Sequence, residues 1–289
     1  MKKTFILMLL LCLAFSSAHS QYIVATGGGD PLTYTDKIDT ITNYHIQILY
    51  ELKFMPDTLE RENYDRRITV LNLSPEGISN YCEYSLFKTD SIKSQYIENG
   101  KIRLSVMNKA MKYGGRVFDR YIIVKSWPEK NKLFHIETIG LDGKFSYTED
   151  LPDFGWEVDF SQTKVIGGYT CHSAKGRYAG RDYQAWFTMD IPINDGPWKF
   201  QGLPGLILEV ASLDEEYSYT CMSIRKTEGS LVVTGLDVAG KTTRENFLKA
   251  YKRYKKNPAA ALSALGDKIQ SSTNFKNRKD RAINPQEKY

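Results

Sequence analysis

Short strand-like segments follow one another along most of this chain, and their spacing limits the fold more than any other feature. Few helical patterns separate them, whereas parallel βαβ units would need a helix between strands. The 19 Tyr and 13 Phe of the chain also favour sheets. The sequence therefore predicts a mainly β fold with one large antiparallel sheet. Strands are expected at residues 40–54, 67–73, 78–87, 119–127, 132–139, 143–148, 157–160, 162–166, 169–175, 182–189, 206–211, 217–225 and 230–234.

Short helices are predicted at two places. Residues 103–113 fit a helix that stops at Gly114 and Gly115. The sequence Thr-Thr-Arg-Glu at 242–245 is a capping box, which predicts a helix up to residue 257. Pro258 can begin a second short helix, because proline is tolerated in a first helical turn.

The N-terminus has the pattern of a secretory signal peptide at residues 1–20. Lys2 and Lys3 precede an apolar run, and small residues stand before Gln21. A lipoprotein signal at Cys12 is a minor alternative. We expect a flexible segment at 21–38, a single β-rich domain at 39–270 and a polar tail at 271–289. The mature chain is thus expected to be exported to the periplasm or cell envelope, with no transmembrane segment.

The charge of the chain does not indicate a nucleic-acid partner. The formal net charge of +5 falls to +3 without residues 1–20, whose only charged residues are Lys2 and Lys3. Basic residues gather only at 252–256 and 276–281, and such runs are usually solvated helix faces or tails.

No residue constellation typical of catalysis or metal binding is found. His172 and Ser173 are adjacent, so on a strand they point to opposite faces and cannot form a nucleophile–base pair. The chain has no Gly-x-Ser-x-Gly, Cys-x-x-Cys or His-x-x-x-His pattern. Met107 and Met111 share a helix face, which is more typical of a core than of a copper site. We expect no enzyme activity, no cofactor and no metal.

Three cysteines follow the predicted signal peptide: Cys82, Cys171 and Cys221. An oxidising compartment permits a disulfide, and the simplest pairing joins Cys171 with Cys221.

A three-residue pattern occurs three times: an aspartate, then a residue with a hydroxyl group, then an aliphatic residue. The hydroxyl groups belong to Thr40, Thr58 and Ser91. The pattern resembles the O-glycosylation acceptor of Bacteroidetes envelope proteins. Coincidence explains three matches to so short a pattern equally well.

The segment at 196–210, G-P-W-K-F-Q-G-L-P-G-L-I-L-E-V, joins two predicted strands with an unusual loop. Loops normally surround Gly and Pro with polar residues, whereas this one carries Trp198, Phe200 and Leu203. Its turns are set by Gly196 and Pro197 at one end, and by Gly202, Pro204 and Gly205 at the other.

Residues 164–210 resemble the GLPGLI family of exported Bacteroidetes proteins, named for the six residues Gly202 to Ile207. Gly-Tyr-x-Cys at 168–171, Gly-Arg at 180–181 and Ala-Trp-Phe-Thr at 185–188 also match, in order. Asn284, Pro285 and Glu287 are similar to the closing motif of the family. The resemblance implies an envelope location and no established activity.

Two interpretations of the loop remain open. In the first, Trp198, Phe200 and Leu203 plug an end of the sheet. In the second, the loop is a lip over an apolar cavity, where these side chains, Pro204 and the neighbouring Trp186 contact a ligand or partner. Arg181 could add a contact to an anion, as could Lys199.

An antiparallel sheet with small helices is similar to the open half-barrels that carry lipoproteins or lipids across the periplasm. The function expected is therefore a non-catalytic envelope protein that binds a lipid-like hydrophobic ligand, or a partner protein, through the half-barrel concavity. The alternative is an interaction subunit of an outer-membrane transport system without a small ligand. An uncharacterised hydrolase is a third and weaker alternative.

Overall fold

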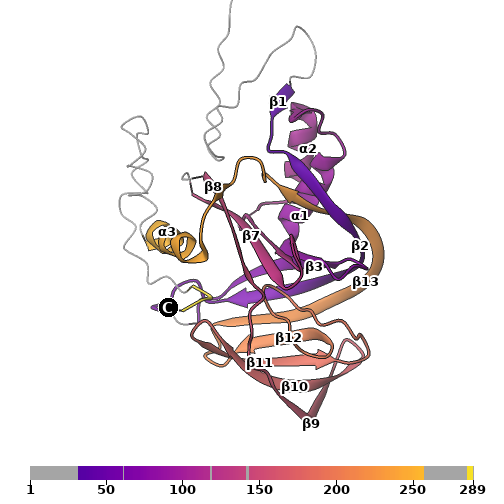
Figure 1. Cartoon of the computed structure of the whole chain (residues 1–289), viewed down its shortest axis with the longest axis vertical. Coiled ribbons are helices and arrows are strands. Elements are labelled where there is room, and N and C mark those ends of the chain that lie inside the picture. Colours follow the sequence, from indigo (N-terminus) through magenta and orange to yellow (C-terminus); the bar gives the residue numbers. More distant parts are fainter. Residues whose placement is uncertain (1–31, 61, 118, 141–142, 257–284, 289) are drawn as a thin grey trace, which may run out of the picture.

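The computed structural model describes residues 32–60, 62–117, 119–140, 143–256 and 285–288 (Figure 1). The predicted signal peptide, the second C-terminal helix and Asn284 lie outside the described residues, as do most of the flexible N-terminal segment and of the polar tail. No described helix is long and apolar enough to cross a membrane.

The elements are β1 (Leu32–Tyr34), β2 (Ile38–Phe54), β3 (Asp65–Leu73), β4 (Ser79–Glu83), α1 (Tyr84–Ser94), β5 (Lys101–Arg103), α2 (Leu104–Gly114), β6 (Tyr121–Lys125), β7 (Lys132–Ile139), β8 (Gly143–Asp150), β9 (Glu157–Ile166), β10 (Tyr169–Tyr178), β11 (Arg181–Thr188), β12 (Leu206–Ser212), β13 (Tyr217–Thr234), β14 (Gly240–Lys241) and α3 (Arg244–Lys256).

Among the described residues, twelve strands form one sheet that does not close into a barrel. Their order is β14-β8-β7-β6-β4-β3-β2-β13-β12-β11-β10-β9. Pairing is antiparallel throughout this sheet except between β14 and β8. Strands β1 and β5 form a separate pair. The predicted mainly β, largely antiparallel fold with short helices is confirmed.

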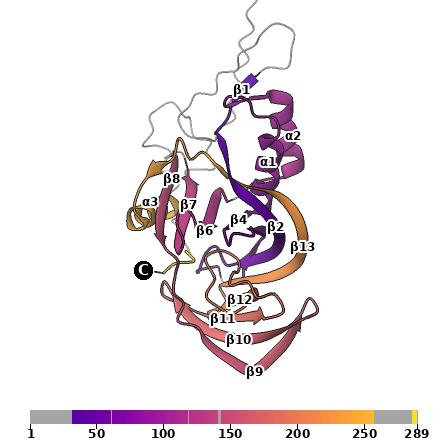
Figure 2. The same ribbon diagram turned by 45° about the vertical axis from the view of Figure 1, so that its right-hand side comes forward.

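The paired strands β2 and β13 are long and carry the bend of the sheet. They pair from Phe54 with Tyr217 to Ile38 with Thr234, and the register shifts three times. Bulges of this kind bend a strand and increase its twist. Figure 1 shows the resulting arc, and Figure 2 shows β9–β12 lying beneath the middle strands.

The main core lies where strands β10–β12 face strands β2, β3, β4, β6 and β7. Tyr183 and Phe187 of β11 are fully buried there, together with Tyr50 and Leu71 from β2 and β3. The Tyr50 hydroxyl donates a hydrogen bond of 2.7 Å to the Ile207 carbonyl, which joins the two parts of the sheet. This core is closed by side chains from strands that are distant in the sheet order.

A second core covers the opposite face of β3, β4, β6 and β7. Neighbours along a strand point to opposite faces, so Val70 lies in the second core and Leu71 in the main core. Leu86 of α1 packs against the second core, and Leu231 from the far end of β13 is buried in it. The middle of the sheet is therefore covered on both faces.

The predicted strand at 78–87 is wrong in its second half. Strand β4 ends at Glu83, and Tyr84 begins helix α1. Tyr84 and Phe87 are three residues apart and stack with ring centroids separated by 6.1 Å, a contact that helical spacing favours. A short apolar run fits the helical and the strand period alike, so this segment was ambiguous.

Other boundaries differ from prediction in smaller ways. The segments at 157–160 and 162–166 join as β9, and those at 217–225 and 230–234 join as β13. Helix α2 agrees with its prediction to within one residue. Helix α3 is capped by Thr243, whose hydroxyl accepts from the Asn246 amide at 3.3 Å, so the cap lies one residue after the predicted one.

Candidate functional site

The loop between β11 and β12 has its large apolar side chains buried. The exposed fraction is 6% for Trp198, 0% for Phe200 and 1% for Leu203. Phe200 packs edge-on against Tyr183 and Tyr219, with centroid distances of 4.9 and 5.7 Å. These residues belong to the main core. The dry surface that the loop faces is therefore the interior of the protein itself, as in the plug interpretation.

Glycines allow this loop to approach its neighbours. A Cβ atom at position 205 would lie 2.1 Å from the Thr188 carbonyl oxygen, so only glycine fits there. At Gly196 a Cβ atom would come within 2.9 Å of the Ile207 Cβ atom. Gly202 has a φ of +100°, a conformation that favours glycine. The glycines thus bring the backbone close to β11 and β12.

The other predicted loop residues are not equally buried. Pro197 is buried at the start of the loop, whereas Pro204 is exposed. Trp186 of β11 is half-buried, and the Lys164 ammonium group lies 4.5 Å from the centroid of its indole ring. Pro204 and Trp186 therefore retain access from outside, in contrast to Phe200 and Leu203.

Lys125 of β6 anchors the start of the loop. Its ammonium group forms an ion pair with the Asp195 carboxylate. It also donates to the carbonyl oxygens of Gly196 and Phe200, at 2.7 and 3.2 Å. Burial lowers the pKa of Lys125, and the charge of Asp195 opposes this effect. One buried ammonium group thus binds three acceptors at the start of the loop: a carboxylate and two backbone carbonyls.

Lys199 lies at the centre of a buried ionic cluster. Its ammonium group is 2.5 Å from Glu149 of β8 and 2.6 Å from Glu287 near the C-terminus. Arg244 of α3 contacts the same two carboxylates, at 2.9 and 2.5 Å. Burial alone would lower the pKa of Lys199, but the Tyr147 hydroxyl and the two carboxylates hold that pKa well above its usual value.

Arg181 forms a second buried cluster, beside the first. Its side chain is fully buried and pairs with Asp214 at 2.5 Å and Glu216 at 2.6 Å. It also donates to the backbone carbonyls of Pro285 and Gln286, both at 3.0 Å. The sequence suggested that Arg181 and Lys199 contact an anion. The anions that they contact in this structure are carboxylates of the protein itself.

The three cysteines carry free thiols in this structure. Cys171 lies on β10 and Cys221 on β13, and strands β11 and β12 lie between them in the sheet. Both side chains belong to or pack against the main core. The disulfide between Cys171 and Cys221 is not formed in this structure and stays a prediction.

The three candidate glycosylation residues differ in accessibility. Thr40 is exposed on β2, whereas Thr58 and Ser91 are half-buried. Asp90, which precedes Ser91, is buried and accepts a hydrogen bond of 2.7 Å from Thr234. Glycosylation of these residues stays a prediction, and Thr40 offers the most accessible hydroxyl group.

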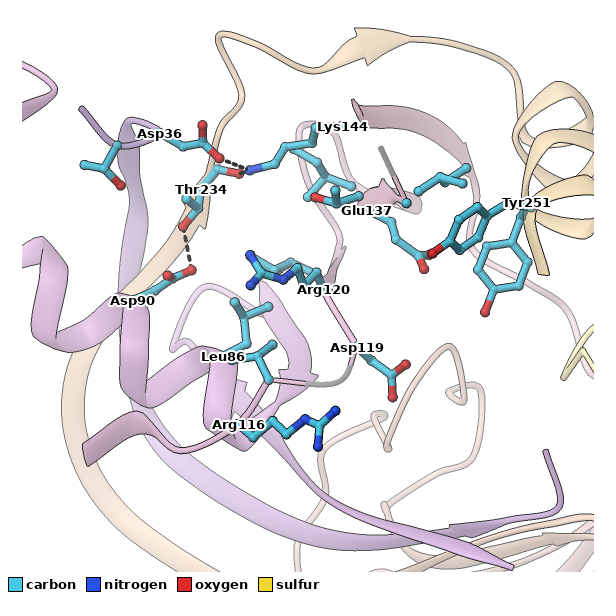
Figure 3. A pocket seen from close by; sticks show the side chains of 18 of the residues that line it. Asp36, Leu86, Asp90, Arg116, Asp119, Arg120, Glu137, Lys144, Thr234 and Tyr251 are labelled. Atoms are coloured by element: carbon cyan, nitrogen blue, oxygen red, sulfur yellow. Dashed lines mark hydrogen bonds and ion pairs between the residues drawn. The ribbon is translucent and has the colours of Figure 1, made fainter. Parts of the chain in front are cut away.

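A cavity of about 590 Å³ lies between α1, strands β6–β8 and α3 (Figure 3). Ile122, Ile136 and Ile139 contribute an apolar part to its lining, and all three are buried. Figure 3 shows Arg120 between α1 and Tyr251 of α3. The cavity thus combines buried aliphatic side chains with charged ones.

Basic side chains outnumber acidic ones around this cavity. The acidic residues are Asp36, Asp90, Asp119 and Glu137, and the basic residues are Lys93, Arg116, Arg120, Lys144 and Lys255. Asp36 is neutralised by Lys144 at 2.6 Å, and Asp90 lies 3.6 Å from Lys93. Asp119 lies 3.7 Å from Arg67, which is not part of the lining. The lining therefore favours an anionic group.

Sequence reasoning missed this cavity. Its lining residues come from separate parts of the chain, around residues 35, 90, 120, 140, 234 and 254. None of these parts carries a motif that predicts ligand binding, and only the fold brings them together. The basic residue Lys255 lies in the run at 252–256, for which the sequence predicts a solvated helix face or tail.

The sequence profile of a family described as "Protein of unknown function (Porph_ging)" matches residues 177–209, which include the buried loop. No curated protein matches the chain significantly.

Two solved structures are among the matches. A structure of PNGF-II matches with a TM-score of 0.48 at 12% identity; the match covers 74% of this chain and 34% of that chain, so the present chain spans about a third of its length. The LolA superfamily protein NE2245 from Nitrosomonas europaea matches with a TM-score of 0.24 at 6% identity, over 64% of this chain and 86% of that chain.

The burial of Leu203 leads to a first prediction. Leu203→Asp places a carboxylate among apolar side chains, so we expect the free energy of unfolding to fall by more than about 3 kcal/mol. Urea unfolding followed by circular dichroism measures this change. Leu213→Asp is the matched control, because Leu213 is 55% exposed. Unchanged stability of Leu203→Asp together with lost ligand binding would support the lip interpretation instead.

A second prediction concerns Lys125. Lys125→Met leaves the Asp195 carboxylate without its cation in a buried position, so we expect a loss of about 3–5 kcal/mol in the free energy of unfolding. The exposed residue Lys130 provides the control variant Lys130→Met, for which no comparable loss is expected. Equal stability of the two variants in urea would contradict the anchoring role of Lys125.

The Arg181 cluster predicts a pH dependence. Burial acts to raise the pKa of Asp214, but hydrogen bonds from Lys288 and Ser212 outweigh it and lower that pKa from 3.8 to about 2. A carboxylate with a lowered pKa in the folded state stabilises the fold above its unfolded pKa, and this contribution is lost as the pH falls from about 4 to about 2.

Asp214→Asn should therefore be less stable than the wild type at pH 7, and the difference should shrink as the pH approaches about 2. Urea unfolding between these pH values measures the difference. Asp190→Asn is the control, because Asp190 is exposed. A difference between wild type and Asp214→Asn that stays constant with pH would contradict the assignment.

Proposed function

We propose that this protein is an exported, non-catalytic binding protein of the cell envelope, and that its ligand is a lipid-like amphiphile with an anionic head group. The observation that carries the proposal is the cavity between α1, strands β6–β8 and α3. Its volume of about 590 Å³ lies within the range of about 300–1,000 Å³ that is usual for ligand sites.

The apolar part of the ligand would contact the face of the sheet that the second core covers. Ile122 and Ile136 belong to that core and also line the cavity. Tyr251 and Tyr254 of α3 add aromatic surface on the opposite side. A chain of methylene groups between these surfaces would be removed from water, which contributes about 0.8 kcal/mol for each buried group.

The anionic head group would contact the arginines of the α2–β6 connection. Arg116 and Arg120 both line the cavity, and Figure 3 shows Arg120 between α1 and α3. A guanidinium group binds carboxylate and phosphate oxygens in a bidentate manner. The acidic residues at the cavity compete little for this role, because Lys144 pairs with Asp36, Lys93 with Asp90 and Arg67 with Asp119.

The opposite side of the sheet is a poorer candidate. The main core already holds Trp198, Phe200 and Leu203 in the space where a lip would have contacted a ligand. The proposed site therefore uses the other face of the sheet. Export is supported by the signal-peptide pattern at residues 1–20.

The proposal predicts binding of dodecyl phosphate, a simple anionic amphiphile, in isothermal titration calorimetry. Arg120→Glu should weaken the affinity about tenfold or more, since it replaces an attractive charge by a repulsive one. Arg225→Glu is the matched control, because Arg225 is exposed on β13 and does not line the cavity. Dodecyl maltoside, which lacks the anionic group, should bind more weakly than dodecyl phosphate.

Equal affinities of the wild type and Arg120→Glu for dodecyl phosphate would place the ligand elsewhere. Mass spectrometry of the protein extracted from its native envelope gives an independent test, in which a co-purifying anionic lipid is expected. The absence of any bound lipid and of any dodecyl phosphate binding would contradict the proposal.

One observation favours the second candidate function, an interaction subunit. Strand β9 is the last strand of the sheet, and it exposes Phe160 by 55% and Val165 by 71%. An edge strand with exposed apolar residues can pair with another chain. A stable complex with an envelope protein that Val165→Lys disrupts, without any bound lipid, would favour this function over the first.

A further inference from the structure

Residues 285–288 pack between the β10–β11 turn, the β12–β13 turn and α3. The residues that they contact there are called the groove below, and they include Ala179, Arg181, Lys199, Asp214 and Arg244. Figure 1 shows this segment below α3 and above β11 and β12. The Arg181 guanidinium group donates hydrogen bonds to two consecutive backbone carbonyls of this segment, those of Pro285 and Gln286. The amide of Lys288 donates to the Ala179 carbonyl at 2.7 Å. Backbone hydrogen bonds on both sides are typical of a peptide in a binding groove.

Side chains of the same segment are also recognised. The Gln286 side chain accepts a hydrogen bond of 2.7 Å from the Tyr219 hydroxyl. The Glu287 carboxylate, with an exposed fraction of 6%, lies between Lys199 and Arg244. The Lys288 ammonium group is 2.7 Å from Asp214. The groove therefore distinguishes a glutamate and a following lysine by charge.

The charges of the groove balance without the peptide. Three cations of the groove, Arg181, Lys199 and Arg244, face three carboxylates of the groove, Glu149, Asp214 and Glu216. The peptide adds one further carboxylate and one further ammonium group. Departure of the peptide therefore leaves the six groove charges balanced in sum, with Lys199 and Arg244 sharing Glu149 while Asp214 and Glu216 share Arg181. A replacement peptide needs a carboxylate and an ammonium group at the same two places to restore the balance within each cluster.

We propose that this groove is a peptide-binding site for the sequence Pro-x-Glu-Lys, in which the segment 285–288 acts as a ligand held in cis. The same motif on another protein chain can take its place when the segment is displaced. The backbone contacts supply general affinity for an extended segment, and the pairs around Glu287 supply selectivity. This inference is independent of the ligand proposed for the cavity.

The test is fluorescence anisotropy with a labelled peptide, Asn-Pro-Gln-Glu-Lys-Tyr, added to the full chain. Glu287→Lys reverses the charge between Lys199 and Arg244, so the attached segment should leave the groove. We expect saturable binding of the peptide to this variant. The wild type should bind the peptide at least about tenfold more weakly, because its own attached segment competes at a high effective concentration. A peptide with lysine in place of glutamate should not bind.

Two controls keep the test decisive. Glu228→Lys makes the same charge change at an exposed position of β13 and should behave like the wild type. The near-ultraviolet circular dichroism of Glu287→Lys shows whether the variant is folded. If that signal is lost, the anisotropy measurement is made with Glu287→Gln, which removes the charge without reversing it. Absence of peptide binding to the folded variant would overturn the proposal, as would equal affinity of the wild type and the variant.

Discussion

The contact between Lys125 and the loop after β11 determines how the rest of the fold is arranged. Its ammonium group satisfies the Asp195 carboxylate and the carbonyls of Gly196 and Phe200 within the protein. Burial of an ammonium group is costly, and only a complete set of acceptors offsets that cost. Because two of the acceptors are backbone groups, the contact fixes the path of the loop. Phe200 and Leu203 then fill the space between the two parts of the sheet.

A chain of contacts joins the buried loop on one side of the sheet to the cavity on the other side. Lys199 of the buried loop binds Glu149 and Glu287, and both carboxylates bind Arg244 at the start of α3. Tyr251 and Lys255 of the same helix line the cavity. The helix that forms one wall of the cavity is therefore tied to the loop through charged groups.

The sequence predicted the fold better than the site. Strand alternation and turn residues located most strands, because these signals are local. They failed at Tyr84, where a short apolar run fits both periods. The loop at 196–205 was recognised, and its plug interpretation agrees with its burial. The cavity could not be recognised, because Arg120 and Tyr251 become neighbours only through the fold. Lys199 and Arg181 were noticed as cations, but their carboxylate partners lie more than 30 residues away in sequence.

Buried ion pairs often contribute little net stability compared with apolar residues of similar size, so their number here needs another explanation. The Lys199 cluster draws one charged group from each of four places: the loop, strand β8, helix α3 and the segment 285–288. Apolar side chains tolerate small shifts in packing, whereas a buried cation requires its acceptors at hydrogen-bond distance. We infer that the cluster specifies how these four elements meet. A main core that is largely aromatic, with Phe200 against Tyr183 and Tyr219, supplies the cohesion, and the charged groups supply the geometry.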